Sequence, residues 1–277
     1  MTVLAFILTV AAILPLAAIL LKILQSGFGN LSWEAVSSLP NYNELLLDED
    51  IPGEGNGFRQ AIVGTLAMVG AASLVSIPFG VLTGVFLSEF TVGSLRASFA
   101  APFVRFLIKI LSSVPTVIIG IFAYVLLVIP FSFSAIAGAF ALAVVMIPIV
   151  TLTTEESLRL VPNSYRLGSA ALGGGRFNTI FRIIIPAALP AITTGILLAV
   201  ARAAGETAPL MFTALFNDFE WQGWDQPTAS LTVLIYQYAS SPYPQQQKFA
   251  WTAALILVAL VFATNVISRL VTRRQRL

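Results

Sequence analysis

The sequence has no cysteine and no histidine in its 277 residues. Without cysteine, the protein has no disulfide, no thiol nucleophile and no cysteine-ligated metal. Without histidine, a serine–histidine–aspartate triad, a zinc–histidine site and a histidine proton relay are excluded. We therefore expect no metal centre, no cofactor and no catalytic residue in this chain.

Charge is also scarce. Charged residues make up 10% of the sequence and hydrophobic residues 57%, a balance far too apolar for a soluble domain. It indicates a polytopic membrane protein, whose first partner is the lipid bilayer, and no nucleic-acid partner is expected. The phosphate-binding pattern G-x-x-x-x-G-K-[ST] is absent from the sequence. Any nucleotide hydrolysis that drives this protein would have to occur on another polypeptide.

Long uncharged runs predict six transmembrane helices and an all-α fold. The run at residues 110–154 would be about 68 Å long as one helix, so it must fold back, and Pro130 to Ser134 is the expected hairpin. The other four spans are predicted at residues 3–21, 61–87, 190–216 and 249–268. We expect the whole chain, 1–277, to form a single transmembrane domain.

The distribution of lysine and arginine predicts the orientation of the six spans. Eleven basic residues fall in the second, fourth and C-terminal polar segments: Arg96, Arg105, Lys109, Arg159, Arg166, Arg176, Arg182, Arg269, Arg273, Arg274 and Arg276. The opposite segments contain Arg59 and Lys248, with Lys22 at a span edge. Basic residues favour the cytoplasmic side. Both termini and the 155–190 loop are therefore predicted inside, and the acidic 25–60 and aromatic 217–248 segments outside.

Two opposite charges interrupt the fifth span. Arg202 lies near its predicted mid-depth and Glu206 one helical turn later. An arginine there costs about 2.5–3.5 kcal/mol on insertion scales, so it normally faces protein or water and suggests a transport pathway. The alternative is a structural pair, because residues i and i+4 meet on one helix face. Gly205 and Pro209 would let the helix open beside a cavity.

Two polar stretches complete the set of candidate residues. Ser112 to Thr116 contributes hydroxyl groups that either line a polar cavity or bond back to their own helix. In the 155–190 loop, Pro162, Asn163 and Ser164 offer a helix stop and an N-cap, residues 165–172 can form two helical turns, and glycines from Gly173 onward end them. This stretch predicts a short surface helix between two spans.

The same loop carries a family resemblance. Gly173, Ile183, Ile185 and Pro186 follow the spacing of the EAA loop of ABC importer permeases, although Leu167, Gly168 and Ser169 replace Glu-Ala-Ala and Ile185 replaces leucine. Residues 153–162 (TTEESLRLVP), 201–214 (ARAAGETAPLMFTA) and 235–243 (IYQYASSPY) sharpen the match. Together they resemble phosphate ABC transporter permeases of the PstA type, over about residues 60–270.

The resemblance implies a type I ABC importer permease fold in the cell inner membrane. The chain would form half of a phosphate pathway together with a sister permease of the PstC type. Two copies of a cytoplasmic ATPase and an extracytoplasmic phosphate-binding protein would complete the importer. Arg202, Glu206 and Thr207 would belong to the substrate pathway. Eleven residues would couple to the ATPase: Asn163, Ser164, Tyr165, Arg166, Leu167, Gly168, Ser169, Ala170, Ala171, Leu172 and Gly173.

Three alternatives remain open at this point. The first is a permease for another oxyanion, such as sulfate or molybdate. The second is an ion-coupled secondary transporter with Arg202 and Glu206 as a proton-linked pair, which internal repeats would favour. The third is a membrane scaffold or sensor subunit, which needs no charge inside the membrane.

Overall fold

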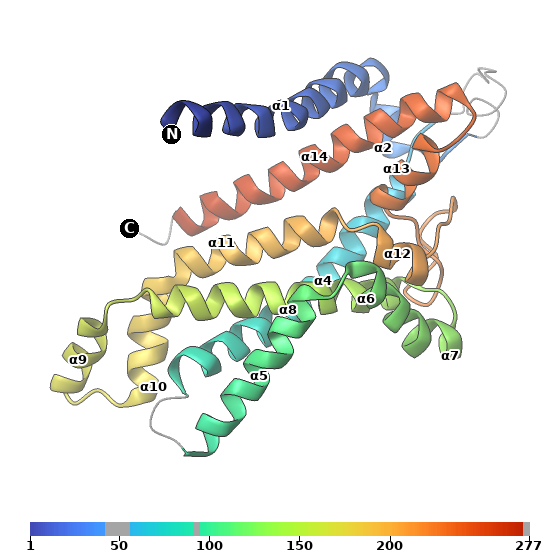
Figure 1. The fold of residues 1–277 in the computed structure, drawn as a ribbon. Coiled ribbons are helices and arrows are strands. Elements are labelled where there is room, and N and C mark those ends of the chain that lie inside the picture. The colour runs from blue at the N-terminus through green and yellow to red at the C-terminus, as the bar shows by residue number, and fades with distance from the viewer. Residues whose placement is uncertain (42–55, 91–94, 274–277) are drawn as a thin grey trace.

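The computed structural model of the protein describes residues 1–41, 56–90 and 95–273. Within these ranges every regular element is a helix, which confirms the all-α prediction. Figure 1 shows the long helices running roughly alongside one another, with α1 beside α14. The start of α1 and the end of α14 lie at the same end of the bundle as α9 (Figure 1).

Five continuous helices are long and apolar enough to cross a membrane, and a bent pair raises the number of candidate spans to six. Four of the five are α1 (Thr2–Gly27), α4 (Arg59–Glu89), α8 (Ala135–Arg159) and α14 (Pro244–Arg273). The fifth joins α10 (Arg176–Thr179) to α11 (Ile185–Ala204) through the π-helical turn Ile180–Ile184. In the polar 25–60 segment, a 3-10 turn (Phe28–Asn30) precedes α2 (Trp33–Ser37), and residues 42–55 lie outside the described residues.

The third span is broken rather than straight. The helix α5 (Leu95–Ser113) takes in Arg105 and Lys109, which the sequence placed in a connecting link, and a bend of 103° separates it from the next helical stretch. The bend falls at Val114–Pro115, because proline lacks an N–H and drives the preceding residue out of helical geometry. Beyond it follow α6 (Thr116–Ala123), the π-helical turn Tyr124–Val128 and α7 (Ile129–Phe131).

The hairpin predicted at residues 130–134 is confirmed. Ser132 has a φ of 77°, in the left-handed region, and reverses the chain after α7. The Ser134 hydroxyl then accepts a hydrogen bond from the N–H of Ala137 and caps α8. A serine cap satisfies one of the unpaired N–H groups of the first helical turn. The fourth span therefore begins at the position that the sequence indicates.

The prediction of a fifth span over residues 190–216 is wrong at both ends. The helical stretch begins earlier, at Arg176, and ends at Ala204, and a separate helix α12 (Ala208–Thr213) follows. Proline is favoured in the first turn of a helix and unfavourable inside one, so Pro209 fits the start of α12 and not the continuation of α11. The opening that Gly205 and Pro209 were expected to permit is present.

The aromatic segment after α12 returns to the bundle. The helix α13 (Leu231–Ala239) is capped by Ser230 and packs against α14. Leu231 and Leu234 are fully buried there. Tyr238 is only 5% exposed, so it is part of a core and not an aromatic side chain at the membrane interface. Trp224, Tyr236 and Tyr243, in contrast, are exposed, as an interfacial belt requires.

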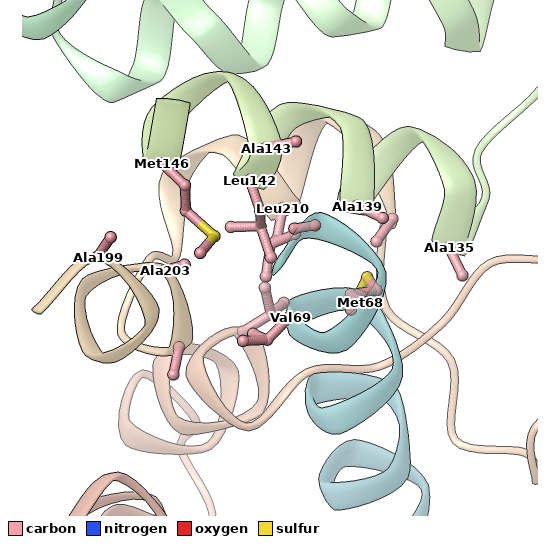
Figure 2. Close-up of a cluster of buried hydrophobic side chains, with 14 of the residues drawn as sticks. Met68, Val69, Ala135, Ala139, Leu142, Ala143, Met146, Ala199, Ala203 and Leu210 are labelled. Atoms are coloured by element: carbon pink, nitrogen blue, oxygen red, sulfur yellow. The ribbon is translucent and has the colours of Figure 1, made fainter. Parts of the chain in front are cut away.

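A buried core joins the middle of the bundle to the end of α11. Met68 and Val69 of α4, Leu142 and Met146 of α8, and Ala203 of α11 belong to one cluster (Figure 2). Between membrane-spanning helices such side chains stabilise the bundle through van der Waals packing, because lipid is as apolar as the core. This core holds the segment that carries the intramembrane charges against α4 and α8.

Candidate functional site

Arg202 and Glu206 lie at the point where the fifth span ends. The Arg202 Nε donates to Glu206 Oε1 at 3.3 Å, so the predicted i,i+4 pair forms. The backbone opens just after Ala204, yet its groups have partners. The Glu206 N–H bonds the Ala203 carbonyl at 3.2 Å, and the Thr232 hydroxyl of α13 donates to the Glu206 carbonyl at 2.9 Å. Such pairing is what non-helical backbone requires at membrane depth.

The two charges differ in their exposure. The side chain of Arg202 is 52% exposed and that of Glu206 is 14% exposed. Arg202 opens onto a cleft of about 190 Å³ between α5, α6, α8 and α11. The same cleft is lined by Val145 and Pro148, which lie near the middle of α8. Arg202 is therefore level with the middle of a candidate span, and an anion in the cleft can reach its guanidinium.

Three hydroxyl groups line this cleft with Arg202: those of Ser112, Thr116 and Thr153. Ser112 donates to the Lys109 carbonyl at 2.9 Å and Thr153 to the Ile149 carbonyl at 2.8 Å. Both predictions for the serine stretch therefore hold for Ser112, which lines the cavity and bonds back to its own helix. A hydroxyl that donates to the backbone keeps its oxygen lone pairs as acceptors.

The remaining residue predicted for the pathway is placed differently. Thr207 is half-buried at the N-cap position of α12, and it is not among the residues that line the cleft. Thr116, which belongs to the stretch expected to line a polar cavity or bond back to its own helix, lines the cleft as the first residue of α6. The first turn of that helix therefore borders the cleft, and the N-terminal end of a helix carries partial positive charge. The break at Pro115 creates this arrangement.

The eleven residues predicted to couple to an ATPase lie together at one end of the bundle. Asn163 to Ala171 form α9, and the two that follow form its C-terminal turn. The predicted cap by Asn163 or Ser164 is wrong, because the helix starts at Asn163, two residues earlier than predicted, with Pro162 at its N-cap position and no side-chain cap. The glycine stop is confirmed. Gly173 has a φ of 76° and its N–H bonds the Ala170 carbonyl at 3.0 Å.

The helix α9 carries exposed apolar side chains and is anchored at one buried residue. Tyr165, Leu167 and the C-cap residue Leu172 are exposed, and Leu172 reaches 92%. Ser169 is buried, and its hydroxyl lies 2.7 Å from that of Thr179 in α10. The remaining members of the predicted set are exposed, except Arg166, which is half-buried. Exposed apolar side chains on an otherwise anchored helix are typical of a surface that meets a partner protein.

Two buried carboxylates near α9 were not predicted from the sequence. Glu89, the last residue of α4, pairs with Arg166 of α9 at 2.5 Å. Glu155 of α8 is 5% exposed and pairs with both Arg105 and Arg159, each at 2.6 Å. Each of these groups looks in the sequence like an ordinary charge at a span end. Only the i,i+4 spacing of Glu155 and Arg159 gives a local signal.

Comparison with protein families identifies the class. A family model described as binding-protein-dependent transport system inner membrane component matches residues 76–277. Solved structures of the MetNI methionine ABC transporter in inward-facing conformations share the fold, with a TM-score of 0.66 at 20% identity, covering 78% of this chain and 94% of the other. The chain belongs to the binding-protein-dependent transport family of membrane permeases, and it has the type I ABC importer permease fold.

The relatives narrow the assignment to one branch of that family. The phosphate transport system permease protein PstA of Haemophilus influenzae is 46% identical over 79% of this chain and 77% of its own length. A probable PstA of Methanocaldococcus jannaschii is 37% identical over 92% of this chain and 86% of its own. At this identity and coverage, the branch to which the chain belongs is that of the PstA permeases.

Proposed function

We propose that this protein is a membrane subunit of an ATP-driven phosphate importer and forms half of its translocation pathway. The observation that carries the proposal is Arg202, a half-exposed guanidinium that opens onto a cleft level with the middle of α8. The named function of the PstA relatives supports phosphate as the substrate. The guanidinium is permanently charged, and its planar set of N–H donors matches the spacing of phosphate oxygens.

The pair of charges accounts for a preference between oxyanions. Arg202 would attract the anion, and Glu206 would orient or gate it, with Thr207 at the start of the next helix. Phosphate near neutral pH keeps a proton and can donate a hydrogen bond to a carboxylate or hydroxyl oxygen, whereas sulfate cannot. A site whose acceptor group needs a hydrogen bond from the ligand rejects a ligand that cannot donate one. The acceptor oxygens of Ser112 and Thr153 would add to this preference.

The remaining parts of the importer are separate polypeptides. A sister permease of the PstC type would supply the other half of the pathway, and an extracytoplasmic phosphate-binding protein would deliver the substrate. Two copies of an ATPase would dock on the cytoplasmic side. The exposed apolar side chains of α9 and its C-terminal turn, Tyr165, Leu167 and Leu172, would meet one of them. With α9 in the cytoplasm, the start of α1 and the end of α14 would lie there too, since they share its end of the bundle (Figure 1).

The experiment that tests this function uses the assembled importer in proteoliposomes. The binding protein and labelled phosphate are added on one side and ATP is supplied on the other. We expect phosphate to accumulate against its gradient only when ATP is present, and an excess of sulfate to leave the rate unchanged. Equal inhibition by unlabelled sulfate and unlabelled phosphate would contradict the assignment of the substrate.

A further inference from the structure

Glu89 is a carboxylate at the very end of a membrane-crossing helix, and it is almost completely buried. Its side chain is 7% exposed, although it stands where a helix would normally meet water. A buried charge is costly unless it is paired and hydrogen-bonded. Here Arg166 supplies two bonds, from Nη2 to Oε1 at 2.5 Å and from Nε to Oε2 at 3.2 Å, and the hydroxyl of Ser88 adds a third at 3.1 Å.

The guanidinium of Arg166 also reaches the neighbouring span. Its Nη1 donates to the Val161 carbonyl at 2.9 Å and its Nη2 to the Leu158 carbonyl at 3.1 Å. One side chain of α9 thus joins the end of α4 to the end of α8. A planar guanidinium with five donors is suited to such a junction, and lysine could not reproduce it.

A second arginine holds Glu89 from the other end of the loop. Arg176, the first residue of α10, donates to the Glu89 backbone carbonyl, and its guanidinium lies 5.1 Å from the ring centroid of Phe90. Arg166 and Arg176 flank the exposed turn that contains Leu172. Both sides of this turn are therefore attached to the last turn of α4.

Apolar packing supports this attachment only beyond α9, where Val85 of α4 shares a buried cluster with Ile180 and Ile184. A cavity of about 600 Å³ separates α9 from the end of α4, and its lining includes Glu89, Arg159, Arg166, Ala170 and Arg176. Close-packed interiors transmit displacement through van der Waals contact. Since side chains do not fill this space, the polar contacts of Glu89 with Arg166 join α9 to α4 across it.

From Glu89, the helix α4 leads directly to the candidate pathway. Near the middle of α4, Val69 and Ala72 belong to the buried cluster that also contains Ala203 and Ala204, the neighbours of Arg202 (Figure 2). A displacement of the end of α4 along its axis would therefore move the surface on which the Arg202 segment rests.

We propose that Glu89 is a positioning residue for transport. Arg166 and Arg176 hold Glu89, and Glu89 thereby attaches the loop between these two arginines to α4. Through α4, the movement of α9 reaches the segment that bears Arg202. This inference rests on the proposed function, because it assumes that an ATPase moves α9. Glu89 touches neither substrate nor nucleotide in this account. Loss of the Glu89 carboxylate should uncouple ATP hydrolysis from phosphate transport. The binding of the ATPase and of phosphate should remain.

The test replaces Glu89 with Gln in the reconstituted importer and measures the phosphate transported per ATP hydrolysed. We expect this ratio to fall about tenfold, the size of a typical coupling between two sites. The ATPase should remain in the purified complex. The matched control is Glu156→Gln, which removes one carboxylate from the exposed side of the nearby end of α8 and should leave the ratio unchanged.

A second variant separates positioning from folding. The chain has no cysteine, so Glu89→Cys with Arg166→Cys creates a unique pair that a bifunctional maleimide can join. Cross-linking should restore the transport ratio that the double substitution loses. Two results would contradict the proposed role of Glu89. One is a transport ratio that the cross-link does not restore in the double variant, and the other is a normal ratio in Glu89→Gln. Failure of the unmodified complex to move phosphate would instead contradict the proposed function.

Discussion

The close contact of α4 with α8 leads to a sharp prediction for Gly84. A Cβ added at Gly84 would lie 2.7 Å from Thr154 Cβ and 2.8 Å from the Thr151 carbonyl oxygen, distances that force the helices apart. Gly80, one turn earlier, is equally crowded, with 2.7 Å to Val150 Cβ. Such i,i+4 glycines let two membrane helices approach closely. We therefore expect Gly84→Ala to destabilise the subunit.

The expected loss of stability is defined by comparing two matched variants, Gly84→Ala and Gly70→Ala. Overpacking a close contact costs about 1–3 kcal/mol. Replacing a helical glycine with alanine also gains roughly 1 kcal/mol of helix propensity. Gly70 lies on the same helix and has nothing within 4 Å of an added Cβ, so Gly70→Ala has the gain without the cost. The propensity term cancels in the comparison, and Gly84→Ala should be less stable than Gly70→Ala by about 1–3 kcal/mol.

The assay is unfolding of the purified subunit in mixed micelles by titration with a denaturing detergent. Helix content follows the transition, and the two variants are compared in the same lipid and detergent. Phosphate uptake measured alongside should fall in Gly84→Ala, because α4 and α8 no longer move as one packed unit. Equal stability of the two variants, to within about 0.5 kcal/mol, would refute the close packing described here.

Three further predictions concern orientation, docking and the cleft. A cysteine introduced at Gln222 should react with an impermeant thiol reagent in cells with an accessible outer face, and one at Gln275, outside the described residues, should react only after permeabilisation; the reverse pattern would overturn the orientation. Leu172→Asp should release the ATPase during purification, because a charge buried in the docking groove costs several kcal/mol; normal retention with normal uptake would exclude Leu172 from that surface. Thr153→Val should lower the phosphate transport rate about tenfold at unchanged subunit abundance, since a lost acceptor costs about 1.4 kcal/mol or more; an unchanged rate would remove this hydroxyl from the substrate path.

The spans were predictable because the bilayer imposes a local rule. A charge inside hydrocarbon is costly wherever it occurs, so uncharged runs report the spans without knowledge of the fold. The hairpin after Phe131 was equally local, set by length and turn residues. The 103° break at Pro115 and the return of α13 into the core were not predicted. Pro15, Pro78 and Pro148 all lie inside continuous helices, so proline alone does not identify a break.

The contacts of the candidate site were also predictable only where they are local in the sequence. Arg202 and Glu206 lie four residues apart, and this spacing alone signals the pair in the sequence, although Glu206 lies beyond the end of α11. Glu89 and Arg166 are 77 residues apart, and only the packed bundle brings them together. Thr153 lines the cleft because it packs against Gly195 of α11, a contact without a sequence signal. Residues that act through tertiary contacts are thus the ones that sequence patterns miss.

The central claim is that Arg202 serves the substrate and not only the fold. The most direct measurement compares Arg202→Met, Glu206→Gln and the double variant for subunit abundance and phosphate uptake. If the pair were only structural, each single change would strand a charge in the membrane and destabilise the subunit, and the neutral double variant would recover. The pathway account predicts normal abundance without phosphate uptake in Arg202→Met, and no rescue in the double variant. Recovery of uptake in the double variant would contradict it.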